Sequence, residues 1–198
     1  MGYPLPVESV RKPNATYQDV LAAPEEYVAE LIAGELHLQP RPAKPHTFCA
    51  SALGIEIGAK FQRGLGGPGG WWILNEPELH FGEDVLVPDL AGWLRSDTPS
   101  FDESVAYYTE RPEWVCEVSS PSTARKDRVL KLDAYHRAQV TWAWIVDPVA
   151  QTVEVFQWSQ QGWLRSQTAE GSAPVALAPF GRVALELEAV WPPGSSTV

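Results

Sequence analysis

The sequence lacks the features of a membrane or secreted protein. No apolar run approaches the roughly 20 residues that a helix needs to cross a bilayer, and the N-terminal stretch has no apolar core of the signal-peptide type. Cysteine is scarce: Cys49 and Cys116 are the two present, and neither has a partner at metal-ligand spacing. We therefore expect a cytoplasmic protein with no membrane partner and with two reduced, buried thiols.

Basic residues are also few. Lysine and arginine total 15 against 25 aspartates and glutamates, which gives a formal net charge of −10. Proteins that bind nucleic acid gain affinity by neutralising phosphates with Lys and Arg, so this balance disfavours a general nucleic-acid-binding protein. A nuclease remains compatible with it if the acids gather at a metal site and on a remote face. Tryptophan, by contrast, is abundant: nine tryptophans predict either an aromatic core or a protein–protein interface.

The order of apolar patterns predicts an α/β (α+β) fold. The chain divides into three parts, which we expect to be a flexible leader over residues 1–15, a single domain over 16–190 and a flexible tail over 191–198. An N-terminal β-hairpin is expected to turn at Ala33-Gly34. Helices are expected over 46–63, where Phe48, Ala52, Ile55 and Ala59 recur at helical spacing, and from the SPST segment to about Ala138.

Strands are expected in several β-rich runs after the first helix. They cover 71–81 (with an irregularity at Pro77), 85–93, 114–119, 141–146, 152–158, 163–168 and 183–187. Helix, strands, helix and strands in this order are typical of a central mixed sheet that is flanked by helices.

Glu117 is a single acid within an apolar strand. Val115, Glu117 and Ser119 should share one face of this strand, because side chains alternate. The apolar neighbours predict a sheet interior, where a carboxylate is costly unless it is paired or bound to a cation. The alternative is an edge strand, with Glu117 in solvent or in a salt bridge.

Asp89 is a second single acid in an apolar stretch, and it follows Pro88. A proline there predicts a bend or bulge, and bulges redirect side chains near active sites; the alternative is an ordinary Pro-Asp turn. If the strands of Asp89 and Glu117 are neighbours, the two carboxylates converge, and their repulsion favours a shared proton or a bound cation. Oxygen ligands with open water positions favour Mg²⁺, and Mn²⁺ is the alternative ion.

Three further residues are candidates for the site because of their positions in the sequence. Lys131 lies on the helix after Glu117, so its ammonium either stands near the metal or pairs with Asp127 on the helix surface. Glu35 follows the hairpin turn and is either a metal-linked acid or an exposed turn residue. His46 opens the long helix, where a solvent-facing residue is the common outcome.

Four segments of the sequence carry a specific resemblance. They are YVAELIAGELHLQP, the Pro-His pair that opens the first long helix, VLVPDLAGW, and WVCEVSSPSTARKDRVLKLDAYHRAQVTWAWIVDPVAQTVEVF, and the resemblance covers about residues 17–158. The chain resembles the Uma-two family, bacterial proteins assigned to the restriction-endonuclease-like, PD-(D/E)XK nuclease superfamily. The most specific part is the stretch that starts at Glu117-Val118 and runs through SPST to Asp127 and Lys131.

This resemblance implies a restriction-endonuclease-like core and metal-dependent phosphodiesterase chemistry. Asp89 matches the aspartate of the superfamily, and Glu117 matches the acidic member of its (D/E)XK motif. Glu35 matches the acid at the N-terminal end of the core. Ser119 stands where the superfamily carries lysine, and that role passes to Lys131 on the helix.

We therefore predict a Mg²⁺-dependent endonuclease that acts on nucleic acid, with DNA favoured over RNA. Asp89, Glu117 and the backbone carbonyl of Val118 hold the metal, Lys131 orients or activates water, and Glu35 assists through a metal-bound water. Two alternatives are open. One is a nuclease-fold binding or regulatory module without turnover, which the acidic balance and the displaced lysine favour. The other is an assembly protein, a homo-oligomer joined through its tryptophans.

Overall fold

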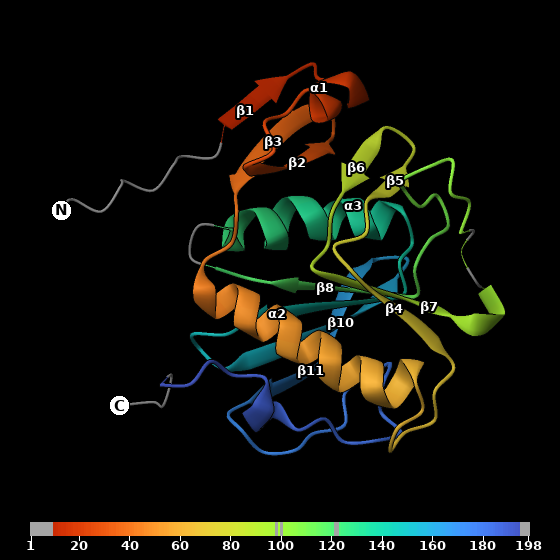
Figure 1. Ribbon diagram of the computed structural model, residues 1–198, viewed down its shortest axis with the longest axis vertical. Coiled ribbons are helices and arrows are strands. Elements are labelled where there is room, and N and C mark those ends of the chain that lie inside the picture. Colours follow the sequence, from red (N-terminus) through yellow and green to blue (C-terminus); the bar gives the residue numbers. More distant parts are fainter. Residues whose placement is uncertain (1–9, 98, 100, 121–122, 195–198) are drawn as a thin grey trace.

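Two β-sheets form the framework of the protein, which is described here by a computed structural model that covers residues 10–97, 99, 101–120 and 123–194 (Figure 1). The larger sheet has, in spatial order, β11 (Gly162–Glu170), β10 (Thr152–Ser159), β9 (Trp142–Asp147), β8 (Trp114–Val118), β7 (Leu90–Leu94) and β4 (Trp71–Asn75). The smaller sheet has β1 (Val10–Pro13), β3 (Glu35–Pro40), β2 (Tyr27–Ile32), β6 (Asp84–Leu86) and β5 (Leu79–Phe81).

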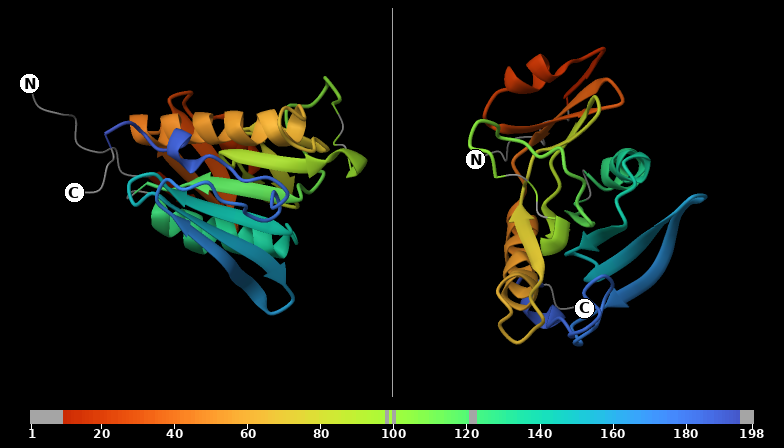
Figure 2. Two further views of the ribbon diagram at one scale, coloured as in Figure 1. Left: turned by 90° about the horizontal axis from the view of Figure 1, so that it is seen from below. Right: turned by 90° about the vertical axis from the view of Figure 1, so that its right-hand side faces the viewer.

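Helices cover both faces of the larger sheet. On one face lies α2 (Lys44–Ile57), which the π-helical segment η1 (Gly58–Gln62) extends; on the other lie the π-helical segment η3 (Lys126–Lys131) and α3 (Leu132–Arg137) (Figure 2). Strands β8 and β9 are parallel, whereas the other neighbouring pairs of this sheet are antiparallel. The prediction of a mixed sheet flanked by helices is therefore confirmed. Among the described residues, no helix combines the length and the apolar character that a membrane span requires.

The N-terminal hairpin forms as predicted. Strands β2 and β3 pair with Ile32 opposite Glu35, and Ala33 and Gly34 connect them with φ angles of 52° and 76°. Two successive positive φ angles are typical of a type I′ turn, whose twist matches that of the strands. The short helix α1 (Tyr17–Leu21) precedes this hairpin.

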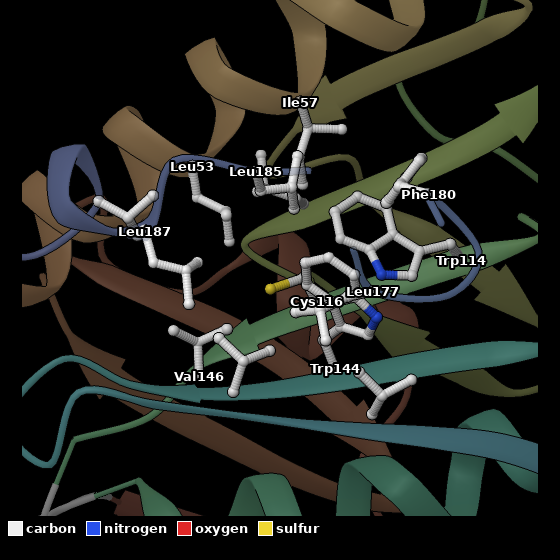
Figure 3. Close-up of a cluster of buried hydrophobic side chains, with 14 of the residues drawn as sticks. Leu53, Ile57, Trp114, Cys116, Trp144, Val146, Leu177, Phe180, Leu185 and Leu187 are labelled. Carbon is white, nitrogen blue, oxygen red and sulfur yellow. The ribbon is translucent and has the colours of Figure 1, made fainter. Parts of the chain in front are cut away.

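The main core lies between α2 and the larger sheet (Figure 3). Leu53 and Ile57 of α2 pack towards Trp114 and Trp144 of the sheet, and Phe180 contacts both indole rings edge to face. Both cysteines are buried in this core as free thiols. None of the nine tryptophans is exposed, so the structure favours the aromatic-core explanation of their number.

Two predicted strands are each divided between the two sheets. Residues 71–81 form β4 in the larger sheet and β5 in the smaller one, and Pro77 lies between them. Residues 84–94 divide in the same way around Pro88. The irregularities at both prolines are confirmed, but a continuous strand is wrong in each case, because proline cannot donate to a ladder and the chain crosses between sheets there. The strand expected over 183–187 is reduced to an isolated bridge between Val175 and Leu185.

Both ends of the chain carry more structure than a leader and a tail would have. Residues 10–13 form β1 and pair with β3 instead of belonging to a flexible leader. Trp191 is buried, and its indole N–H donates to the Gly171 carbonyl at 2.8 Å. The rest of the expected leader, 1–9, and the end of the expected tail, 195–198, lie outside the described residues.

Candidate active site

Asp89 and Glu117 stand at the same end of two neighbouring strands. In the antiparallel pair β7–β8, Leu90 is opposite Cys116, so Asp89 and Glu117 are each one step beyond that pair. Asp89 Oδ2 also accepts a hydrogen bond of 2.6 Å from the backbone N–H of Val118. The structure therefore brings these two predicted residues together.

Glu117 lies in the interior of the larger sheet. Its strand, β8, is flanked by β7 and β9, so the alternative of a solvent-exposed carboxylate on an edge strand is wrong. The other alternative, a salt bridge, is present with Lys131. Glu117 Oε2 accepts a hydrogen bond from Lys131 Nζ at 2.8 Å, and Oε1 accepts one from the Tyr135 hydroxyl at 2.6 Å. Each carboxylate oxygen can accept a further bond or coordinate a cation.

Lys131 is buried, and its ammonium has three oxygen partners. Nζ donates to the Val87 carbonyl at 2.9 Å and lies 2.8 Å from both Glu117 Oε2 and Glu30 Oε1. The alternative of a surface pair with Asp127 is wrong, because Asp127 is buried as well and accepts a 3.0 Å hydrogen bond from the Ser119 hydroxyl. The prediction that Lys131, on the helix after the Glu117 strand, lies near Glu117 is therefore confirmed.

Glu30 is the acid that reaches Lys131 from the N-terminal hairpin. Its side chain is 0% exposed, it pairs with both Lys126 and Lys131, and its Oε1 accepts the Val87 N–H at 2.9 Å. Glu35 does not join this group. Its side chain is 41% exposed and lies 3.4 Å from His37, because Glu35 follows directly after the hairpin turn.

The buried charges are unequal in number. Three buried acids, Glu117, Asp127 and Glu30, and the half-buried Asp89 meet two buried lysines, Lys126 and Lys131. An excess of carboxylates in a site of low polarity favours the uptake of a proton or a metal cation.

These surroundings shift the pKa values of Glu117 and Glu30 in opposite directions. Burial raises the pKa of Glu117 well above its usual range, and the charges of Asp127, Asp89 and Glu30 add to this effect against the attraction of Lys131. Burial acts in the same direction on Glu30, but there the two lysine ammonium groups prevail and lower the pKa to about 2. For Lys131, burial opposes the charged form, yet the surrounding carboxylates raise its pKa overall. Lys131 therefore stays an ammonium at neutral pH.

The donor set fits a hard divalent cation. Asp89, Glu117 and the Val118 carbonyl supply oxygen atoms, and Mg²⁺ commonly takes one or two carboxylates and keeps several waters. No group of three or more His, Cys, Asp and Glu side chains is arranged as a ready ligand set in the described part of the chain. An ion would therefore have to draw its ligands together.

Comparisons with known proteins identify the family of the chain and a protein of similar fold. The model of the family Uma2, described as "Putative restriction endonuclease", matches residues 15–189. The chain belongs to the Uma2 family. A solved structure from Anabaena variabilis, titled a "putative nuclease belonging to DUF820", shares 22% sequence identity with a TM-score of 0.68 and covers 89% of this chain and 97% of that chain. At this identity the similarity shows a shared fold. No curated protein matches the chain.

Three residues around this Uma2 site escaped the sequence reasoning, although two of them carried a signal. Glu30 lies between Ala29 and Leu31 in β2, which is the same pattern of one acid in an apolar strand that singled out Glu117. Tyr135 lies four residues after Lys131, and side chains at this spacing share a helix face. Lys126 carried no such signal, since its partner Glu30 belongs to the other sheet.

Proposed function

We propose that this Uma2 protein is a divalent-metal-dependent endonuclease that hydrolyses phosphodiester bonds of nucleic acid, with Mg²⁺ as the expected ion and DNA as the favoured substrate. The observation that carries the proposal is the placement of Asp89 beside buried Glu117, with Lys131 in contact with Glu117. Buried ion clusters are weak contributors to stability compared with apolar packing. A functional reason for keeping this cluster is therefore the better explanation, and the family description supports it.

The residues divide the work as follows. Bound to Asp89, Glu117 and the Val118 carbonyl, the ion would polarise the scissile phosphate and lower the pKa of a bound water. Lys131 acts as a fixed positive charge and hydrogen-bond donor that orients water or stabilises phosphate charge. Its raised pKa argues against a role as general base. Glu30 positions Lys131. The sequence had suggested a different N-terminal acid, Glu35, with a different role, assistance through a metal-bound water.

The acidic balance is compatible with a nucleic-acid substrate if charge is distributed unevenly. Part of the acid excess is buried in the site itself, where the ion would offset it. Two exposed basic residues lie near the site along the chain: Lys44 at the start of α2, and Arg125 directly before Lys126. We expect these side chains to contact phosphates.

Cleavage assays with matched variants test the proposal. Purified protein is incubated with plasmid, single-stranded DNA or RNA in the presence of Mg²⁺, Mn²⁺ or EDTA. We expect cleavage that requires metal and that falls by about 10²-fold or more in Asp89→Asn and Glu117→Gln, as for other groups that stabilise a transition state. Asp133→Asn is the control, because this exposed acid on α3 pairs with Arg137 outside the site.

The outcomes separate nuclease activity from its alternatives. Cleavage that continues in EDTA, or that is equal in Asp89→Asn and the control, would contradict the assigned site. Absence of both cleavage and metal binding would favour the second candidate, a nuclease-fold binding or regulatory module. That candidate is supported by the net charge of −10 and by Ser119 at the position of the superfamily lysine.

A further inference from the structure

The imidazole of His46 lies against the carboxylate that is proposed to hold the metal. His46 Nε2 is 3.1 Å from Asp89 Oδ1, and the side chain is 11% exposed, so the expectation of a solvent-facing residue is wrong. His46 Nδ1 is buried, and the described residues offer it no hydrogen-bond partner. Buried polar atoms are nearly always satisfied, so an unpaired one calls for a catalytic, ionic or solvent explanation.

The surroundings of His46 favour positive charge. Asp89 is in contact with the ring, and the negative charges of Asp127 and Glu76 also act on it. Carboxylates that surround an imidazole in this way also stabilise a metal ion beside it. These acids, Asp89, Asp127 and Glu76, come from three separate segments of the chain, so tertiary folding brings them near His46.

The distance between the two side chains suits a shared ion. Neighbouring ligands of an octahedral cation, each at about 2.1 Å from it, lie about 3.0 Å from each other. The separation of 3.1 Å between His46 Nε2 and Asp89 Oδ1 matches this value. Asp89 is also held in place through its other oxygen by the Val118 N–H. The spacing of these two atoms therefore permits both to bind one ion in place of the hydrogen bond that joins them here, while the other ligands would be drawn in.

We propose that His46 is a nitrogen ligand of the divalent ion, next to Asp89, and that the site consequently prefers a first-row transition ion such as Mn²⁺ over Mg²⁺. The inference rests on the proposed metal-dependent function and replaces Mg²⁺, the ion expected from oxygen ligands alone, with a transition ion as the preferred one. Mg²⁺ is a hard cation that selects oxygen donors, whereas imidazole nitrogen is a favoured donor for transition ions.

Mn²⁺ is itself the probe, because its electron spin reports directly on bound nitrogen. The full chain is titrated with Mn²⁺ alone and examined by electron spin-echo envelope modulation, with affinities for Mn²⁺ and Mg²⁺ measured by calorimetry. We expect nitrogen modulation in the unmodified protein and its loss in His46→Gln. Mn²⁺ affinity should fall by at least about tenfold. Loss of a residue that only hydrogen-bonds to a metal ligand already lowers metal affinity by about 10–100-fold, so loss of a ligand should lower it at least as much. Mg²⁺ affinity should fall less.

His80→Gln is the matched control. His80 Nε2 is also close to a carboxylate, 2.8 Å from Glu78 Oε1, but it lies in β5 and outside the site. This variant should keep both the modulation and the Mn²⁺ affinity. Labelling the unmodified protein with heavy-nitrogen histidine tests the same assignment without a substitution, since the modulation frequencies must then change.

Each outcome bears on one of the two proposals. Bound Mn²⁺ without histidine modulation, or modulation that persists in His46→Gln, overturns the assignment of His46. In that case, loss of Mn²⁺ binding in Asp89→Asn would leave the proposed nuclease site standing. Failure of the unmodified protein to bind Mn²⁺ at all overturns the His46 assignment together with the metal dependence on which it rests.

Discussion

The two faces of β8 show two different ways of burying side chains. Trp114, Cys116 and Val118 point towards α2 and join an apolar core, in which the indole of Trp114 meets that of Trp144 edge to face at 5.2 Å. On the opposite face, Val115 joins a second apolar cluster, whereas Glu117 is bonded to Lys131 and Tyr135. A single five-residue strand thus contributes to two apolar cores and to one buried charged cluster.

The difference shows where stability and function reside. Apolar burial contributes about 25 cal/mol per Å² of area removed from water, so the apolar clusters on the two faces of the sheet hold the fold together. A buried ion network gains little over apolar packing of the same volume, yet losing one partner is costly because charges are left unpaired. The charged face should therefore be sensitive to substitution without being a net source of stability.

Lys131→Met should give the largest effect. It removes the ammonium that Glu117 and Glu30 share, and we expect the free energy of unfolding in urea to fall by about 3–5 kcal/mol. The control is Arg128→Met on the same helix, where the side chain is 38% exposed and pairs with Glu154; its loss should stay below about 1 kcal/mol. Equal losses in both variants would show that the buried charges are not strongly coupled.

Leu53→Ala tests the apolar face. Leu53 is fully buried against the sheet, so its truncation should lower the free energy of unfolding by about 2–5 kcal/mol. Ile55→Ala on the exposed side of α2 should change it by less than about 0.5 kcal/mol. Urea unfolding of the two variants measures both changes. Equal losses in Leu53→Ala and Ile55→Ala would contradict the assignment of the buried side of α2 to the core.

Stability in acid should report on Glu30. Its pKa is lowered from 4.5 to about 2 by the two lysines, so its contribution is present above pH 4.5 and is lost as the pH falls through about 2. A shift of this size corresponds to about 3 kcal/mol. Urea unfolding at a series of pH values should show a shallower acid slope for Glu30→Gln than for the exposed control Glu83→Gln. Identical slopes would refute the assigned coupling.

Tyr135→Phe should give the smallest of these effects. The variant keeps the ring and removes the hydroxyl that donates to Glu117 Oε1 at 2.6 Å. A hydrogen bond to a charged group typically contributes about 1.5–3 kcal/mol, and we expect a loss of unfolding free energy at the lower end of this range. If thermal and urea unfolding are unchanged, the hydroxyl does not stabilise the carboxylate.

Local patterns account for the parts of the site that could be predicted. Single acids in apolar strands singled out Asp89 and Glu117, and sequence adjacency placed Lys131 near them. The same pattern is present around Glu30, but the position of Glu35 directly after the hairpin turn led to the prediction of Glu35 instead. The contact of His46 with Asp89 had no local signal, because it joins the first turn of α2 to the chain between β6 and β7.

The exposed stripe on α2 shows a second limit of local patterns. Phe48 and Ile55, whose spacing predicted the helix, face solvent, while Cys49, Leu53 and Ile57 face the sheet. Both sides of this helix carry apolar residues. Periodicity therefore predicted the helix correctly, and the packing of the sheet decided which side is buried.

The sequence by itself determined the strands, the helices and the isolated acids, because side-chain alternation and helical spacing act over a few residues. Tertiary structure alone decided that the chain crosses from one sheet to the other at two prolines. It also decided that Glu30 of the smaller sheet pairs with Lys126 and Lys131. Such meetings depend on strand register and on helix packing, and these are settled by the burial of the whole core and not by any single segment.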